Sequence, residues 1–389
     1  MNPHNQSTSS YHGFEQGPIR PPSEASSLFI RVTRNCPWNR CTFCPVYKGA
    51  KFSVRPVDHV KKDIDAVYRR GETLQRITGA SGKINQSEIN RVIGDVAPEE
   101  LTAFHAAYNW VFAGGRKSVF LQDANSLIIK PADLVEILKH LRMRFPMVER
   151  VTSYARTQTV ARRKDDDLQA IRRAGLDRIH IGLESGSDKV LQMVKKGVTK
   201  ENHIKAGLKV KRAGMELSEY VMPGLGGRAL SDEHARETAD ALNQINPDFI
   251  RLRTLAIPPG SPLFADYSAG RFDKCTDVMV IKEILLFIEN LDGITSVVKS
   301  DHILNLFEDL EGTLPHDKQR MINMLRTFLA MDPERQRLYQ VGRRLGIFSG
   351  IGDMHDPRRL ARAERFCLEL GITPENVDQV SNELMKRYI

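Results

Sequence analysis

The sequence predicts an α/β protein, a partial (β/α)6 TIM-like barrel with a helical insertion and a mostly helical C-terminal extension. Two observations support this fold class. Short apolar runs alternate with amphipathic helical patterns, and the strand patterns stop near residue 276 while helical periodicity continues. The sequence contains six strand–helix units, whereas a closed barrel has eight, so we expect an open barrel.

Each expected strand leads into a loop and then a helical pattern, which is typical of parallel strands joined by right-handed crossovers. In the first strand Leu28, Ile30 and Val32 alternate with Phe29, Arg31 and Thr33, as in a partly buried sheet. Asp58 is the expected N-cap of the helix that follows. The expected strands cover 28–33, 118–124, 150–155, 178–185, 217–227 and 249–257, and the expected helices cover 58–70, 131–145, 164–175, 187–197, 200–214 and 231–245.

Three segments fall outside this alternation. Residues 1–27 are polar and rich in Ser and Pro, so we expect them to be poorly ordered, and 28–275 form the core barrel. Residues 71–116 form a helical insertion that is a candidate lid. Residues 276–389 form the helical extension, with one short candidate strand at 294–300.

The composition narrows the class of protein. Of the 389 residues, 41% are hydrophobic and 27% charged, which is ordinary for a soluble globular protein. No apolar run reaches the roughly 18 residues of a membrane span, and the N-terminal residues lack the apolar region of a secretory signal. The net charge of +9 favours anionic partners or a basic surface.

Three of the five cysteines, Cys36, Cys41 and Cys44, fall on one short loop after the first expected strand. A structural zinc site wants four ligands, and a disulfide would leave one thiol over. Three thiolates suit a [4Fe–4S] cluster with one iron open to another ligand. A zinc-binding interaction protein remains the alternative from another class. Cys275 and Cys367 are expected to be a loop thiol and a buried apolar residue.

This cysteine loop resembles that of the radical S-adenosylmethionine (radical SAM) superfamily. The common spacing there is CxxxCxxC, whereas here one extra residue separates Cys36 from Cys41. The later segments VFLQDAN, TSYART, IGLESGSDKVLQMVKKGVT and YVMPGLGG are similar to family motifs, closest in style to coproporphyrinogen dehydrogenase-like, Elongator-type and methylthiotransferase-like members. The resemblance implies a set of cofactor-binding residues: Phe43, Gln122, Asp123, Ser153, Arg156, Glu184, Lys196 and Met222.

The resemblance also implies an activity. Cys36, Cys41 and Cys44 would hold a [4Fe–4S] cluster that cleaves S-adenosyl-L-methionine reductively to a 5′-deoxyadenosyl radical, which abstracts hydrogen from substrate. An electron donor of the flavodoxin or ferredoxin type is then required, and a labile cluster with reduced thiols indicates the cytoplasm.

The substrate class follows from two arginines on the last strand of the barrel. Arg251 and Arg253 are two residues apart and therefore share a face. If that face is the barrel interior, they predict a small or medium anionic substrate, with acids of the protein itself, such as Glu219, as the alternative partners. The other register turns both arginines outward against the helices. An RNA-modifying enzyme of the same chemistry is the alternative; the positive charge supports it, while the lack of a recognisable RNA-binding motif does not.

Overall fold

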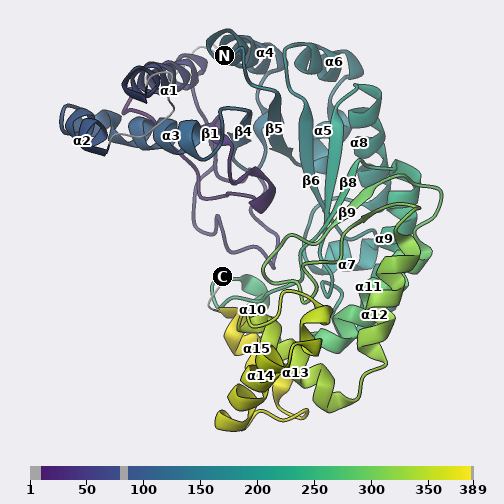
Figure 1. Cartoon of the computed structure of the whole chain (residues 1–389). Coiled ribbons are helices and arrows are strands. Elements are labelled where there is room, and N and C mark those ends of the chain that lie inside the picture. Colours follow the sequence, from purple (N-terminus) through teal and green to yellow (C-terminus); the bar gives the residue numbers. More distant parts are fainter. Residues whose placement is uncertain (1–9, 79–85, 387–389) are drawn as a thin grey trace. The chain divides into compact units, whose positions relative to one another are not determined.

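A computed structural model describes residues 10–78 and 86–386. The chain divides into two units (Figure 1). The first comprises residues 1–37, 51–154 and 166–178, and the second comprises 38–50, 155–165 and 179–389. The cysteine loop is thus split: Cys36 belongs to the first unit, and Cys41 and Cys44 belong to the second.

The first unit is built on three parallel strands in the order β1 (Leu28–Arg31), β4 (Ser118–Gln122) and β5 (Arg150–Ala155). Leu28 lies opposite Val119, and Ser118 lies opposite Arg150. The remaining elements are η1 (Pro22–Glu24), β2 (Thr33–Arg34), β3 (Ser53–Val54), α1 (Val57–Thr78), α2 (Gln86–Gly94), η2 (Pro98–Glu100), α3 (Leu101–Phe112), η3 (Ser126–Ile128), α4 (Pro131–Arg144) and α6 (Asp165–Arg173).

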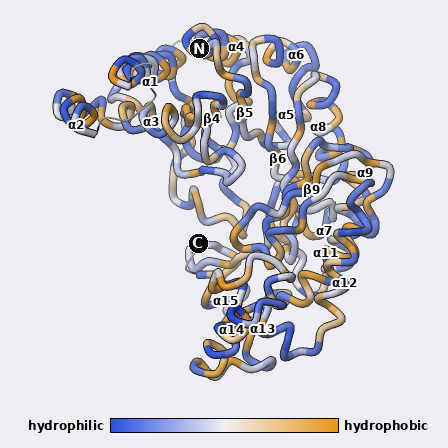
Figure 2. Tube along the Cα trace, in the orientation of Figure 1, coloured by the Kyte–Doolittle hydropathy of each residue, from blue (hydrophilic) through white to orange (hydrophobic). Residues whose placement is uncertain are grey.

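Helix α1 packs along both α3 and α4. Its buried residues Val60, Ile64, Val67 and Leu74 recur at helical spacing, which gives one apolar stripe. Figure 2 shows the resulting alternation of hydrophobic and hydrophilic residues along the helix. The helix runs beyond the expected end at residue 70, so the expected insertion begins inside it.

Residues 10–27 contact the rest of the first unit through a buried side chain and several hydrogen bonds. Phe14 is buried, and the Tyr11 hydroxyl donates to Asp63 over 2.8 Å. The Gln122 side chain accepts from the Gly17 amide at 2.8 Å and donates to the Ile19 carbonyl at 2.7 Å. The segment therefore completes the core of the first unit, whereas residues 1–9 lie outside the described part.

The second unit carries the later strands in the order β6 (Arg178–Glu184), β7 (Glu216–Val221), β8 (Phe249–Leu252), β9 (Val297–Lys299) and β10 (Gly312–Thr313). The pairs β7–β8 and β8–β9 are parallel, and β10 runs antiparallel to β9. Strand β9 lies within the candidate strand 294–300. The helices are α5 (Thr157–Arg162), α7 (Asp188–Met193), α8 (Lys200–Arg212), α9 (Gly227–Ile245), α10 (Pro262–Ser268), α11 (Asp277–Asn290), α12 (Lys318–Leu329), α13 (Pro333–Arg344), η4 (Ile351–His355), α14 (Pro357–Glu369) and α15 (Val377–Met385).

The C-terminal helices belong to this second unit. Helix α11 packs along α9 on one side and α12 on the other. Phe307, Phe328 and Tyr339 form an aromatic core whose ring centroids lie 5.1 to 5.6 Å apart. The apolar face of α11 has to be buried, and α9 covers it.

The predicted fold class is confirmed. Strands β1, β4, β5, β6, β7 and β8 alternate with helices along the chain, as in a partial (β/α)6 barrel. Thr199 caps α8 by accepting from the Asn202 amide. Asp58, the expected N-cap of the first helix, instead lies inside α1, which begins at Val57. Among the described helices, none has the length and apolar character that crossing a membrane requires.

Candidate functional site

The three loop cysteines differ from the other two in their accessibility. All five cysteines are described, and all five are thiols. Cys36, Cys41 and Cys44 are partly exposed, whereas Cys275 and Cys367 are only 5% and 1% exposed. Accessible thiols on one loop suit metal ligation, while buried isolated thiols act as small apolar side chains.

Hydrogen bonds fix the part of the loop that belongs to the second unit, which carries Cys41 and Cys44. The Thr42 amide donates to the Val194 carbonyl at 3.0 Å, and the Thr42 carbonyl accepts from the Leu263 amide at 2.8 Å. Burial raises the pKa of the Cys41 thiol, whereas the positive charges of Lys196 and Arg156 act in the opposite direction. The loop therefore sits beside two cations that favour negatively charged ligands.

Trp38 anchors the segment between Cys36 and Cys41, which is the longer of the two intervals between the loop cysteines. Its indole Nε1 donates to the Lys195 carbonyl at 2.8 Å, and the Arg156 guanidinium lies 5.1 Å from the ring centroid. Gly197 has φ +74°, and a Cβ at this position would overlap the Trp38 ring. Only glycine satisfies both the backbone and the close approach.

Glu184 and Lys196 form a pair at the end of β6. Lys196 Nζ lies 2.9 Å from Glu184 Oε1, with the two side chains 13% and 12% exposed. Burial disfavours the charged lysine, but Glu184 and Cys41 together outweigh burial, and the pKa of Lys196 is raised. Glu184 adopts φ +63°, an unusual left-handed conformation for a non-glycine residue. A Cβ at Gly182 would overlap the Glu184 carboxylate, so the strand leaves room for this pair.

An apolar cluster adjoins the ion pair. Met222 packs in a buried cluster with Val190 and Val194, and Phe43 packs against that cluster. The Phe43 ring centroid lies 5.8 Å from Lys196 Nζ. The second unit thus brings together Phe43, Arg156, Glu184, Lys196 and Met222, five residues that the sequence predicted to bind cofactor.

Two buried residues that the sequence analysis missed support the turns beneath this site. His234 on α9 hydrogen-bonds Ser185 Oγ at 2.8 Å and the Met222 carbonyl at 3.1 Å. Glu283 on α11 accepts from the Gly224 amide at 2.7 Å. A polar residue on the buried face of an amphipathic pattern was the available signal in both cases.

The predicted residues of the first unit have structural partners. Asp123 accepts from Arg31 at 2.7 Å and from the Asn35 amide at 3.0 Å, which orients the chain just before Cys36. Gln122 holds the N-terminal segment, as described above. Ser153 is buried and donates to the Tyr154 carbonyl at 3.1 Å.

Arg251 lies on β8 and Arg253 directly follows it. Of these two arginines, Arg251 is neutralised within the protein. Its guanidinium pairs with Asp301 at 2.5 Å and donates to Ser218 Oγ at 3.2 Å. Arg253 is exposed, and burial together with this arginine lowers the pKa of His302 to about 4. Arg253 is therefore better placed than Arg251 to meet an anion from solution.

The thiols of Cys36, Cys41 and Cys44 are chemically suitable ligands for an iron–sulfur cluster. Thiolates are the usual ligands of such clusters, and the loop carries three accessible ones. Over residues 10–78 and 86–386, no three His, Cys, Asp or Glu side chains converge as a preformed metal site. Assignment of the ligands accordingly depends on the thiol set and on the family of the protein.

The sequence model of the radical SAM superfamily matches residues 30–242, more than half of the chain. The chain belongs to this superfamily, which confirms the resemblance inferred from the motifs. It is therefore an enzyme, and enzymes of this superfamily use a [4Fe–4S] cluster and S-adenosylmethionine.

Among curated proteins, the chain is similar to the tRNA uridine(34) acetyltransferase of Methanocaldococcus jannaschii, with 19% identity over 286 residues that cover 70% of this chain and 50% of the relative. It is also similar to the corresponding protein of Methanocaldococcus infernus, with 23% identity over 31% of this chain and 23% of the relative. The chain thus spans half or less of the length of these curated relatives.

Solved structures give weaker likenesses. An Elp3 structure from Methanocaldococcus infernus has a TM-score of 0.42 at 16% identity, covering 52% of this chain and 53% of that one. Coproporphyrinogen III oxidase (HemN) from Escherichia coli has a TM-score of 0.43 at 15% identity, covering 68% and 52%.

Proposed function

We propose that this chain is a radical SAM enzyme in which Cys36, Cys41 and Cys44 hold the cluster and Glu184 and Lys196 bind the cofactor's methionine end. The observation that carries the proposal is the partly buried Lys196–Glu184 pair at 2.9 Å, beside Cys41, Phe43 and Met222. When bound, S-adenosylmethionine supplies a radical that removes hydrogen from a substrate.

The protein's own residues bind the cofactor, orient it and exclude water from the site. An ammonium such as Lys196 suits the methionine carboxylate, and a carboxylate such as Glu184 suits its amino group, so the existing ion pair offers one partner for each charge. Phe43 and Met222 provide apolar surface for the adenine. Arg156, held on Trp38, adds a second cation.

We further propose a small or medium substrate that carries a carboxylate or phosphate. The exposed Arg253 at the carboxyl end of β8 supports this proposal, because catalytic groups of parallel α/β folds gather at that end. Arg253→Met should raise the KM for such a substrate several-fold while leaving cofactor cleavage without substrate unchanged. Normal turnover by this variant, or a neutral substrate, would remove the argument for an anion.

The cluster ligands can be tested by iron content after anaerobic preparation. Alanine at Cys36, Cys41 or Cys44 should abolish cluster binding, because each thiolate is one of three ligands. Cys275→Ala and Cys367→Ala are matched controls that should retain iron, since these thiols are buried elsewhere. Full iron content in Cys41→Ala would contradict the ligand assignment, and colourless protein with zinc would favour the zinc-binding alternative.

The cofactor assignment has a separate test. The reduced enzyme should release 5′-deoxyadenosine slowly even without substrate. Glu184→Ala should weaken S-adenosylmethionine binding about tenfold or more, since it removes a charge-assisted contact, with near-normal iron content. Absence of 5′-deoxyadenosine from the reduced, cluster-loaded enzyme would refute the catalytic proposal.

An RNA-modifying function is the second candidate. The net charge of +9 and the similarity to tRNA uridine(34) acetyltransferases favour it. We also propose cytoplasmic localisation and a flavodoxin- or ferredoxin-type donor, because the cluster needs a reducing compartment and single electrons.

A further inference from the structure

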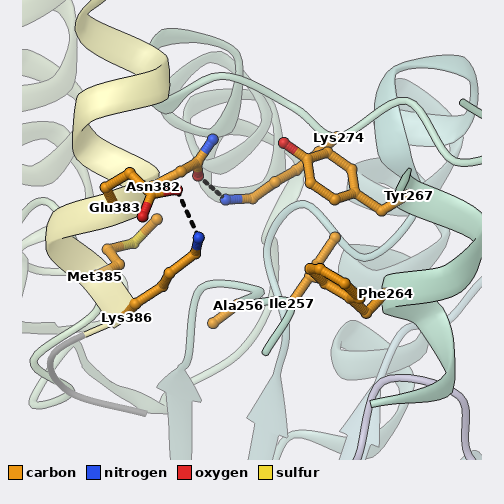
Figure 3. A pocket seen from close by; sticks show the side chains of 9 residues that line it. All are labelled: Ala256, Ile257, Phe264, Tyr267, Lys274, Asn382, Glu383, Met385 and Lys386. Atoms are coloured by element: carbon orange, nitrogen blue, oxygen red, sulfur yellow. Dashed lines mark hydrogen bonds and ion pairs between the residues drawn. The ribbon is translucent and has the colours of Figure 1, made fainter. Parts of the chain in front are cut away.

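A pocket in the second unit lies between the segment after β8, helix α10 and helix α15 (Figure 3). Its cavity volume is about 70 Å³, within about 440 Å³ of empty space that is partly open to solvent. Most of its lining is apolar, formed by Ala256, Ile257, Phe264, Met385 and the ring of Tyr267. Such a pocket with few polar groups is the usual form of a small-molecule site.

Lys274 contributes the principal charge of this pocket. Its ammonium donates to Asn382 Oδ1, as Figure 3 shows. Among the described residues, no carboxylate lies within ion-pair distance of it. The nearby Asp277 is paired with Arg344 at 2.8 Å.

Several charges act on this amine. Burial lowers the pKa of Lys274, and Arg344 adds to that effect, whereas Asp277, Asp378 and Cys275 oppose it. The second lysine of the pocket, Lys386, is exposed and already paired with Glu383 at 2.5 Å. Over the described residues, the Lys274 ammonium is therefore without a carboxylate at ion-pair distance, although Asp277 and Asp378 act on it from further away.

We propose that this pocket binds a small monocarboxylic acid with an apolar body, whose carboxylate pairs with Lys274. One ammonium and one amide match the single charge of a carboxylate. A phosphate would require more donors, and no arginine lines the pocket. The apolar lining then buries the hydrocarbon part of the ligand.

The pocket is connected to the surroundings of the proposed cofactor site. Ile257 lines the pocket and also packs against the apolar cluster that contains Met222. A bound acid would bridge α15 to the segment after β8, and so tie the C-terminal helix to the carboxyl end of the sheet. The binding proposal itself does not depend on the cluster or on S-adenosylmethionine.

Calorimetric titration of the full-length protein with hexanoate tests the proposal. Hexanamide, the neutral counterpart, and inorganic phosphate are the comparison ligands. We expect hexanoate to bind at least about tenfold more tightly than hexanamide, because only hexanoate carries a negative charge that can form an ion pair with the ammonium. Lys274→Met should remove this preference.

Two variants separate the role of Lys274 from general charge. Lys282→Met removes an exposed lysine of α11 that does not line the pocket and should bind hexanoate as the unmodified protein does. Lys386→Met should change affinity by less than about threefold, since exposed ion pairs contribute little. Equal affinity for hexanoate and hexanamide, preferential phosphate binding, or an unchanged Lys274→Met would overturn the proposal.

A labelling experiment covers the case in which Lys274→Met does not fold. In the unmodified protein, hexanoate should slow acetylation of Lys274 by acetic anhydride, measured by peptide mass spectrometry, relative to Lys282. Hexanamide should not do so. Equal labelling with and without hexanoate would also overturn the proposal.

Discussion

Glu219 on β7 is a fully buried carboxyl group, and in the part of the chain that the structure describes neither of its oxygens has a hydrogen-bond partner. Burial holds its pKa well above the usual value, whereas Lys196 acts to lower it and Glu184 to raise it. An unsatisfied buried polar group costs stability, and a charged one costs more. The protonated form is therefore the one that the fold accommodates.

We predict a pH-dependent gain in stability for Glu219→Gln. Because the folded pKa is raised, the contribution of Glu219 is most favourable below the unfolded pKa and declines as the pH rises towards the folded value. The amide of glutamine resembles the neutral acid and lacks this dependence. Urea midpoints of the two proteins should be similar near pH 5, and the variant should become progressively more stable up to pH 8. A constant difference over this range would contradict the assignment of a raised pKa.

Residue roles that depend on local sequence could be predicted better than those that depend on distant contacts. The cysteine loop and the Glu184–Lys196 spacing are local patterns, and the structure places this glutamate and lysine together. The partners of Gln122 are Gly17 and Ile19, about a hundred positions away in sequence. No periodicity near residue 122 indicates that its amide is already engaged.

At the scale of elements, the docking of the cysteine loop on the residues after α7 depends on close packing. Gly197→Ala adds both left-handed backbone strain and a clash with Trp38. We predict that this variant retains substantially less iron and melts at a lower temperature, because the loop loses its position.

Gly214→Ala is the matched control for this prediction. Gly214 has φ +75°, almost the same as the +74° of Gly197, but a Cβ there would meet no atom within 4 Å. It should lower the melting temperature without affecting iron content. Equal iron loss in both variants would show that backbone strain, rather than the contact with Trp38, is responsible.

Most elements were predictable because their periodicity is strong. The expected strand at 150–155 and the expected helix at 231–245 agree closely with β5 and α9. The end of α1 and the whole of β10 were not predicted. Helix α1 continues to Thr78 because its apolar stripe does, whereas β10 has only two residues and exists through its pairing with β9.

At the scale of the whole molecule, the division into units was not predictable from composition. The helices after residue 275 resemble an appended domain in sequence, but α11 buries its apolar face against α9. Amphipathic periodicity shows that a helix has a partner and does not show which partner.

The two candidate substrate classes differ in how binding depends on salt. With a net charge of +9, we expect the protein to bind bulk tRNA through phosphate contacts alone. Affinity measured by filter binding should then fall by about a hundredfold or more between roughly 0.05 and 0.2 M salt. Tight binding that persists at the higher salt and prefers one tRNA would favour the RNA-modifying function.

The chain contains two tryptophans, and each belongs to a different unit. Trp110 is buried in the first unit, where it contacts Phe145 and donates to the Ser118 carbonyl at 2.9 Å. Trp38 is part of the cysteine loop in the second. Their emission can therefore be assigned by single substitutions to phenylalanine. An iron–sulfur cluster absorbs in the near ultraviolet. The fluorescence of Trp38 is therefore expected to be quenched when a cluster binds to the cysteine loop, and this quenching would report cluster assembly.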